Sequence, residues 1–264
     1  MMERERFVAL FEADRRILAS KIFEAVQKSL QNAAPVSTDF LDPGERKELQ
    51  EKLRLIPGLR VLSCGGFREA ERQRLIFIPS YYFTEMVKPG ITALEARLSK
   101  KGAGTEEPLH RDYLGALLAL GIKREKCGDL WVIRGGCQVV LDEEIAPFAV
   151  HNWREAGSCR LECDIIDLEG LKPPAQKSKI IRTTVPSLRL DAVASSGFAM
   201  SRSKMLEEIK AGKMKVNWRE TVNPSQKVAE GDVISMRGRG RMVLAEVGGS
   251  TKKERIFLTL ERFF

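Results

Sequence analysis

The stretch that decides the fold is Arg189–Lys215, which reads RLDAVASSGFAMSRSKMLEEIKAGKMK. Two sets of apolar residues recur in it at three-to-four spacing and predict two short helices: Leu190, Val193 and Ala194, then Met205, Leu206 and Ile209. Gly197 offers a left-handed residue to end the first helix, and Gly212 offers one to end the second. Alternating polar and apolar residues from Lys213 to Val216 predict a strand directly afterwards.

The start of the second predicted helix is suited to hold an anion. Ser201 is a favourable N-cap, and the first-turn N–H groups that follow have no partner inside the helix. Ser203 adds a hydroxyl, while Arg202 and Lys204 place two cations at the positive end of the helix dipole. A bound phosphate would reconcile these cations with the dipole. The alternative is a solvated, serine-capped turn that happens to be basic.

This stretch resembles the S4 RNA-binding domain in the order and spacing of its motifs. The matching segments are Arg189-Leu190-Asp191, Ser201-Arg202-Ser203-Lys204, Ile209-Lys210-Ala211-Gly212, Lys215-Val216-Asn217 and Glu230-Gly231-Asp232-Val233-Ile234. The resemblance implies a helix pair with strands whose basic face grips structured RNA. Trp218 departs from the pattern, because many S4 domains have glycine after the asparagine.

The distribution of charge agrees with RNA binding by this end of the chain. The protein has 264 residues and a net charge of +8. Residues 182–264 carry a net charge of +7, whereas the rest carries only +1. A cationic patch on one domain is typical of a protein that contacts phosphates.

The last 35 residues add an arginine-rich segment to the same domain. Arg237-Gly238-Arg239-Gly240-Arg241 follows a strand predicted at Val233–Met236, and we interpret it as a flexible cationic loop able to follow a phosphate backbone. The alternative is a solvated hairpin tip. A closing strand is predicted at Ile256–Leu260. The expected RNA-binding residues are Arg189, Ser201, Arg202, Ser203, Lys204, Lys210, Lys213, Lys215, Asn217, Arg219, Arg237, Arg239 and Arg241.

The middle of the chain predicts a β-α-β-β-α-β plait, similar to an RNA-recognition motif. The expected elements are strands at 91–98, 129–133, 137–141 and 158–166 and helices at 109–120 and 143–155. Plaits of this kind often stack bases on sheet aromatics. The two expected central strands, 91–98 and 137–141, contain no aromatic residue, so docking of a protein partner is an open alternative.

The whole chain is therefore expected to be an α+β, multi-domain protein. We predict an N-terminal α/β region at residues 1–80, the RRM-like plait at 81–170, a proline-containing linker at 171–180 and the S4 domain at 181–264. In the first region, Asp42-Pro43 is a strong helix start, and Gly65-Gly66 is interpreted as a strand-ending turn.

Other classes of protein find little support in the sequence. There is no Gly-x-Gly-x-x-Gly or Gly-Lys-Ser/Thr motif, and Asp191 is too close to the C-terminus to be the nucleophile of a pseudouridine synthase. Cys159 and Cys163, with His110 and His151, lack the spacing of a zinc site. We expect no catalysis, cofactor, metal or membrane span, and a cytoplasmic monomer with reduced cysteines.

With the S4 domain at its end, the chain resembles the YlmH family, which includes photosystem II S4-domain relatives. Two stretches carry this resemblance: Gly65-Gly66-Phe67 with Ala70–Arg74, and the block His110–Asp129. The resemblance implies a non-enzymatic factor that binds rRNA and tRNA, associated with ribosome quality control on large subunits that carry peptidyl-tRNA. The alternative is a protein-interaction adaptor that uses the plait, with RNA binding secondary.

Overall fold

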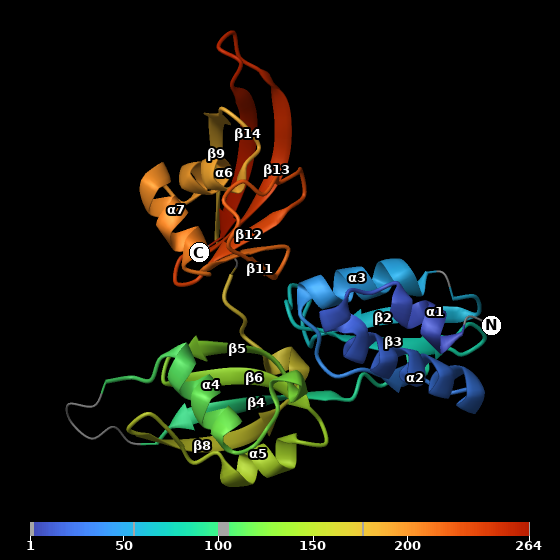
Figure 1. The fold of residues 1–264 in the computed structure, drawn as a ribbon. Helices are drawn as coiled ribbons and strands as arrows, with labels where there is room; N and C mark the ends of the chain where they lie inside the picture. Colours follow the sequence, from blue (N-terminus) through green and yellow to red (C-terminus); the bar gives the residue numbers. More distant parts are fainter. Residues whose placement is uncertain (1–2, 55, 100–105, 176, 264) are drawn as a thin grey trace. The chain divides into compact units, whose positions relative to one another are not determined.

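The computed structural model describes residues 3–54, 56–99, 106–175 and 177–263. Two compact units make up the chain, Met1–Pro174 and Ala175–Phe264 (Figure 1). The boundary lies inside the predicted linker, and the last three linker residues already belong to a strand of the second unit. Each unit combines helices with antiparallel sheets, so the α+β class is confirmed.

The N-terminal region of the first unit is a small sheet covered by helices. Its helices are α1 (Arg4–Ala9), η1 (Ala13–Arg15), α2 (Arg16–Asn32) and α3 (Pro43–Leu53), and its strands are β1 (Val36–Ser37), β2 (Leu59–Cys64) and β3 (Arg74–Pro79). The strand order is β1-β3-β2. The Asp42 carboxylate accepts a hydrogen bond from Glu45 N (2.8 Å), and the Glu45 carboxylate accepts one from Asp42 N (2.9 Å), which is the capping box that starts α3 at Pro43.

The plait follows the connection that contains η2 (Thr84–Met86). Its elements are β4 (Ile91–Leu98), α4 (His110–Ala119), η3 (Arg124–Lys126), β5 (Cys127–Ile133), β6 (Gly136–Asp142), α5 (Ala146–Asn152), β7 (Glu155–Ala156), β8 (Cys159–Ile166) and η4 (Leu168–Gly170). The strand order β5-β6-β4-β8-β7 is that of the predicted plait, extended by the short β7. The aromatic-free strands β4 and β6 are central, as predicted.

Both faces of the plait sheet are covered. Helices α4 and α5 close one face over a core that includes Leu94, Tyr113 and Trp153. The other face has its own buried cluster, formed by Phe40, Ile91, Trp131 and Val140 with Phe67, Leu168 and Leu171 packed against it. Since Phe40 and Phe67 come from the N-terminal region, the face on which plaits usually stack bases is occupied by the protein itself.

Glycines make this close packing possible. A Cβ on Gly128 would lie 2.8 Å from the Phe40 ring, and one on Gly65 would lie 2.5 Å from Ala70 Cβ. Gly65 and Gly66 directly follow β2, as expected for a strand-ending turn. The two stretches that carry the YlmH resemblance meet here, because the Asp129 carboxylate accepts hydrogen bonds from the backbone N–H groups of Glu71 (2.6 Å) and Arg72 (3.1 Å).

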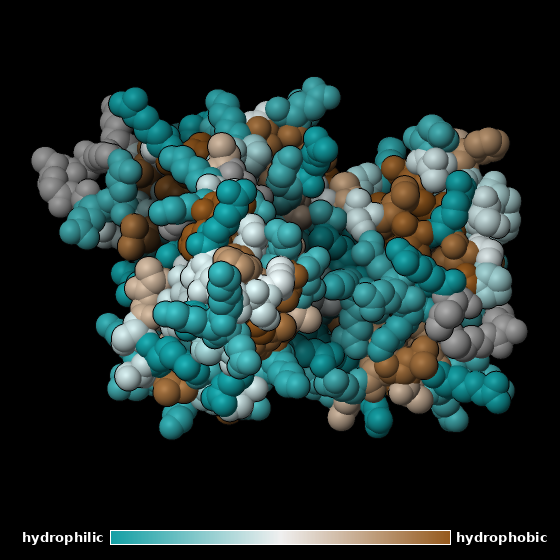
Figure 2. Space-filling view, turned by 90° about the horizontal axis from the view of Figure 1, so that it is seen from above, coloured by the Kyte–Doolittle hydropathy of each residue, from teal (hydrophilic) through white to brown (hydrophobic). Residues whose placement is uncertain are grey.

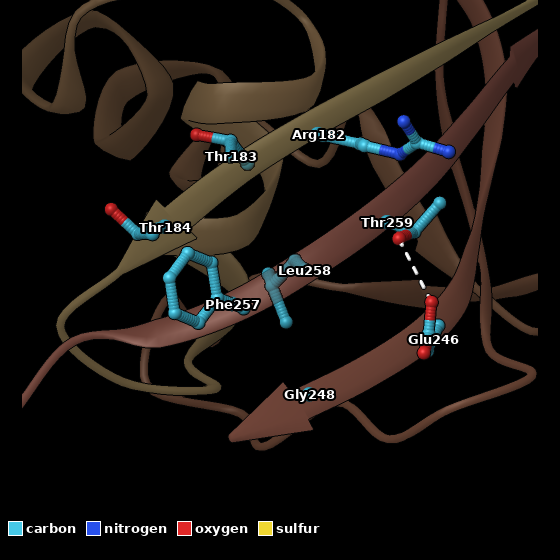
Figure 3. A pocket seen from close by; sticks show the side chains of 8 residues that line it. All are labelled: Arg182, Thr183, Thr184, Glu246, Gly248, Phe257, Leu258 and Thr259. Carbon is cyan, nitrogen blue, oxygen red and sulfur yellow. Dashed lines mark hydrogen bonds between the residues drawn. The ribbon is translucent and has the colours of Figure 1, made fainter. Parts of the chain in front are cut away.

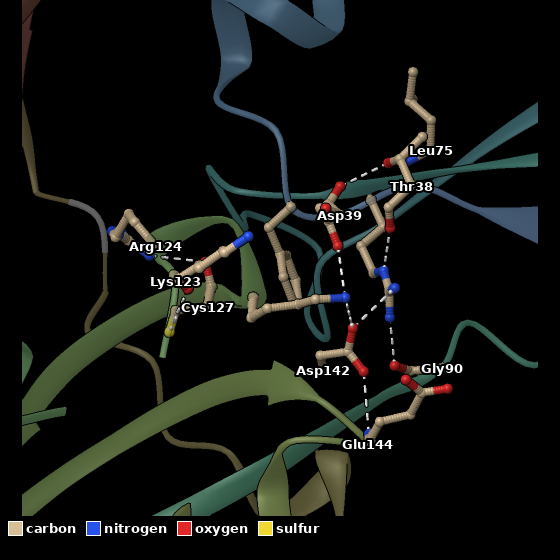
Figure 4. A network of polar contacts seen from close by, with 12 residues as sticks. Thr38, Asp39, Leu75, Gly90, Lys123, Arg124, Cys127, Asp142 and Glu144 are labelled. Carbon is tan, nitrogen blue, oxygen red and sulfur yellow. Dashed lines mark hydrogen bonds and ion pairs between the residues drawn. The ribbon is translucent and has the colours of Figure 1, made fainter. Parts of the chain in front are cut away.

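A buried ionic network joins the N-terminal region to the plait (Figure 4). Asp142 lies between Arg74 Nη2 (3.2 Å) and Lys126 Nζ (2.9 Å), and Lys126 also pairs with Asp39 (2.8 Å). Arg74 donates further to the carbonyls of Thr38 and Gly90. Burial alone would raise the pKa of Asp142, but the bonds from Lys126 and Glu144 N with the charge of Arg74 lower it.

The second unit is a six-stranded antiparallel sheet with two helices on one face (Figure 1). Its elements are β9 (Ser178–Val185), α6 (Leu190–Gly197), α7 (Arg202–Lys210), β10 (Met214–Val216), β11 (Arg219–Thr221), β12 (Val233–Met236), β13 (Gly240–Ser250) and β14 (Ile256–Phe263). The order is β11-β10-β12-β13-β14-β9. One core holds the helices on the sheet, with Leu190, Phe198, Met205 and Ile209 against Met214, Ile234, Met242 and Leu260.

The structure corrects two local expectations for this unit and extends a third. Gly197 is not left-handed; a Cβ there would lie 2.0 Å from Met242 Sδ, so the position needs glycine for packing, and Ala199 takes the positive φ of 53°. Arg241 lies in β13, and Arg237–Arg239 form a closed hairpin turn in which Arg239 N donates to Met236 O (3.0 Å). The closing strand also continues beyond Leu260 to Phe263, because it pairs with β9 along its whole length.

The surface carries apolar side chains among polar ones (Figure 2). Of the aromatic and methionine side chains in the described part of the chain, Tyr81, Phe83 and Met86 in the connection between β3 and β4 are the most exposed, at 67–73%. Among the described residues, no helix combines the length and the apolar character that a membrane span requires.

Candidate RNA-binding surface

The first turn of α7 is exposed and capped as the sequence predicts. The Ser201 hydroxyl accepts a hydrogen bond from Lys204 N (3.3 Å). Met205 and Ile209 are fully buried and fix the helix on the sheet, which leaves Ser201, Arg202, Ser203 and Lys204 exposed to solvent. The positive end of the helix dipole and two cations therefore face outward together.

Asp191 links the two helices on one side of this turn. Its carboxylate, 3% exposed, accepts from Arg189 Nε (3.0 Å) and from Arg202 Nη2 (2.6 Å). Burial tends to raise the pKa of Asp191, but the two arginine bonds outweigh it and keep the pKa below the ordinary 3.8. Both arginines remain about half exposed. Asp191 thus holds two guanidinium groups side by side with one positive charge in excess.

A second cationic group lies on the other side of α7, around Glu208. Lys213 Nζ contacts Glu208 Oε2 (2.7 Å), and this bond is the main reason that the pKa of Glu208 lies below its ordinary 4.5. Lys204 and Arg239 lower the same pKa through their charges. The hairpin turn is tied to this group because Arg237 N donates to Lys213 O (2.9 Å). One cation therefore contacts the Glu208 carboxylate, and two more act on it through their charges.

Two other expected residues lie on the opposite face of the sheet. Met214 and Val216 are in the core beneath the helices, so Lys215 between them faces away. Register places Ser235 beside Lys215 and Arg241 beside Ser235, on that same open face. Lys215 Nζ lies 3.7 Å from Glu220, and the Arg241 guanidinium lies 5.0 Å from the Phe263 ring centroid. The single cationic face expected from the sequence is thus divided between two sides of the sheet.

The remaining expected residues have different surroundings. Asn217 stabilises the β10–β11 turn: its amide donates to Asp232 (2.8 Å) and its oxygen accepts from Val233 N (3.0 Å). Asn217 and Trp218 both have positive φ, 50° and 65°, so the turn stays tight without glycine. Lys210 is exposed in the last turn of α7, and Arg219 is exposed on the edge strand β11.

Sequence reasoning missed the carboxylates that organise these cations. The i+5 spacing of Glu208 and Lys213 spans the end of α7, and only the chain reversal at Gly212 (φ 69°) brings the two side chains together. It also missed Arg182 on β9, although the β-branched residues of 178–185 favour a strand. Of the histidines, cysteines and carboxylates that the structure describes, no three gather as metal ligands would.

Comparison with known proteins agrees with this arrangement of domains. Residues 188–234 match the S4 domain, residues 95–170 match the putative RNA-binding domain in YlmH, and residues 15–82 match the YlmH N-terminal family. The chain is therefore an S4-domain protein of the RNA-binding class.

Its relatives specify the family. The chain is 35% identical over 255 residues to ribosome-associated protein quality control protein P2 of Bacillus subtilis, covering 96% of each sequence. A solved structure, cell division protein ylmH from Streptococcus pneumoniae, matches with a TM-score of 0.52 at 22% identity, covering 61% of this chain and 97% of that one. The protein belongs to the YlmH family.

Proposed function

We infer that this protein is a non-catalytic RNA-binding factor that acts on the large ribosomal subunit carrying peptidyl-tRNA. The observation that supports this function best is the exposed first turn of α7, where Arg202 and Lys204 stand at the positive end of the helix with Lys213 and Arg239 beside them. A helix start with surrounding cations fits phosphates of structured RNA. The relative named for ribosome-associated quality control supports the choice of particle.

The test replaces two cations that no buried carboxylate holds. Lys204→Glu with Arg239→Glu reverses the charge on the Glu208 side of α7. We expect at least a tenfold loss of co-sedimentation with large subunits that carry peptidyl-tRNA, and a fall of about 2 in the slope of log K against log salt. Lys252→Glu with Lys253→Glu is the matched control, because it makes the same charge change in the exposed β13–β14 turn.

Two results would contradict this function. If both double variants lose binding equally, the loss is explained by net charge alone. If the Lys204/Arg239 variant binds as tightly as the wild type, α7 does not contact the RNA. Deletion of Ala175–Phe264 separates RNA binding from the adaptor alternative, since the first unit ends at Pro174. The RNA-binding factor loses its particle on this deletion, whereas an adaptor that acts through the plait keeps its partner.

A further inference from the structure

The open face of the six-stranded sheet, which faces away from α6 and α7, contains a hollow. The cations around α7 do not line it. It has a volume of about 470 Å³, within the range of small-molecule sites. Strands β9, β14 and β13 supply its walls: Arg182, Thr183, Thr184, Glu246, Gly248, Phe257, Leu258 and Thr259 (Figure 3). Cross-strand register places Arg182, Thr259 and Glu246 in one row and Thr184 beside Phe257 in another.

Phe257 gives the hollow a flat apolar wall. Its side chain is 51% exposed, although its neighbours Leu258 and Leu260 are buried under the helices. Across from it, a Cβ on Gly248 would lie 3.2 Å from Phe257 Cβ, so the lack of a side chain there keeps the space beside the ring open. Exposed aromatic rings on a sheet are the usual platform for an unstacked base.

The opposite end of the hollow is polar. It carries the positive charge of Arg182 and the negative charge of Glu246. Glu246 Oε2 accepts from the Thr259 hydroxyl (3.1 Å), which fixes the carboxylate in place. The Arg182 guanidinium is exposed and forms no ion pair or hydrogen bond with residues 3–54, 56–99, 106–175 and 177–263. Figure 3 shows Arg182, Thr259 and Glu246 at this end and Phe257 with Thr184 at the other.

We propose that this hollow binds an unpaired guanine base of the RNA, an extension that rests on the RNA-binding function above. Guanine presents O6 and N7 acceptors that suit arginine, and N1–H and N2–H donors that suit a carboxylate. Its ring stacks on Phe257. The charge of Glu246 disfavours a phosphate in the hollow itself, while Arg255, which donates to Thr184 Oγ1 (3.0 Å), is placed to meet the phosphate of the same nucleotide.

The test uses the full-length protein and two fluorescein-labelled RNAs, a nine-residue oligouridine and the same strand with a central guanosine. Fluorescence anisotropy gives both dissociation constants. We expect the wild type to bind the guanosine strand about tenfold more tightly. Phe257→Leu, which keeps an apolar side chain, and Glu246→Gln, which places a donor against the guanine donors, each bring the ratio close to one.

Glu261→Gln is the matched control, because Glu261 lies on the same face of β14 but outside the hollow, and it keeps the tenfold preference. Equal binding of both strands, or binding of neither, by a wild type that still co-sediments with large subunits overturns the base site and leaves the RNA-binding function intact. Loss of co-sedimentation as well overturns the RNA-binding function. If the Phe257→Leu and Glu246→Gln variants keep the preference for the guanosine strand, the base binds elsewhere and the hollow is not its site. If addition of micromolar GMP abolishes the preference for the guanosine strand, the hollow is a site for a free nucleotide and the assignment to an RNA base is wrong.

Discussion

Gly197 and Ala199 lie two residues apart at the end of α6, and they differ in what limits the side chain at each position. Space is the limit at Gly197, and backbone conformation is the limit at Ala199. Gly197 has ordinary helical geometry but no room for a side chain, since Met242 and Leu260 fill the space. Ala199 has room, because it is exposed, but its φ of 53° strains any residue with a Cβ. The sequence pattern assigned the left-handed role to the glycine because glycine is the usual residue there, and packing against β13 is invisible in a local pattern.

The two positions therefore respond to substitution in opposite directions. Gly197→Ala lowers the free energy of unfolding by about 1–3 kcal/mol, because the methyl group meets Met242 Sδ. Ala199→Gly raises it by about 0.5–1 kcal/mol, because the strain is relieved and little contact is lost. Hydrogen exchange of the α6 and α7 amides measures both changes. A stabilising Gly197→Ala would contradict the packing explanation.

At the scale of elements, α7 carries a carboxylate in the middle of its cations. Glu208 is charged at neutral pH, because Lys213, Lys204 and Arg239 all lower its pKa. It orders these side chains, and it also cancels part of the charge that an RNA phosphate meets. The same is true of Asp191 for Arg189 and Arg202, but Asp191 is buried and supports the helix pair.

Glu208→Gln should therefore strengthen RNA binding. Removal of one negative charge leaves three cations without their shared carboxylate, so we expect affinity for structured RNA to rise about threefold and its salt dependence to become steeper. Titrations at several KCl concentrations measure both effects. Glu207→Gln is the control, since Glu207 is exposed on the outward side of the same helix. Equal gains in the two variants would attribute the effect to net charge alone.

Most elements could be predicted from the sequence, and the division of the cationic surface could not. The helix pair and the plait follow from apolar spacing and from turn residues such as Gly212 and Gly135, which both have positive φ. Which way Lys215 faces depends on which neighbours enter the core, and the place of Arg241 depends on its register with Ser235. Register is fixed by partner strands distant in the chain, so a local pattern could not give the full site.

At the scale of the whole molecule, the Arg74–Asp142 pair holds two regions of the first unit together. The side chains are 9% and 4% exposed, and their partners come from segments as distant as Thr38 and Glu144. The sequence suggested separate N-terminal and plait regions because each has its own apolar pattern. Neither the ionic joint nor the burial of Trp131 beneath Phe67 leaves a periodic signal.

Arg74→Met should cost about 3 kcal/mol of stability, because it leaves buried Asp142 with one cation fewer. Arg97→Met is the control: its exposed contacts with Glu95 and Asp164 are worth less than about 1 kcal/mol. Urea unfolding of the first unit at neutral pH measures both. A loss for Arg74→Met no larger than that for Arg97→Met would show that the joint is dispensable.

The same network predicts an acid-sensitive contribution to stability. The folded pKa of Asp142 lies below its ordinary 3.8, so its contribution is present above that pH and is lost as the pH falls through the folded value. The wild type should therefore approach the stability of Asp142→Asn below pH 3.8. Urea midpoints measured from pH 7 down to pH 3 test this. A constant difference between the two proteins would exclude Asp142 as the titrating group.

The pairing of β9 with β14 constrains the order in which the protein can mature during synthesis. Ser178 pairs with Phe263, so β9, the first strand of the second unit, cannot pair until β14 has been synthesised. The first unit, complete at Pro174, can fold while the remainder is still being translated. The sheet that supports α7, the helix proposed to contact RNA, is therefore completed only after β14 has left the ribosome, so the surface forms late in the folding of the second unit.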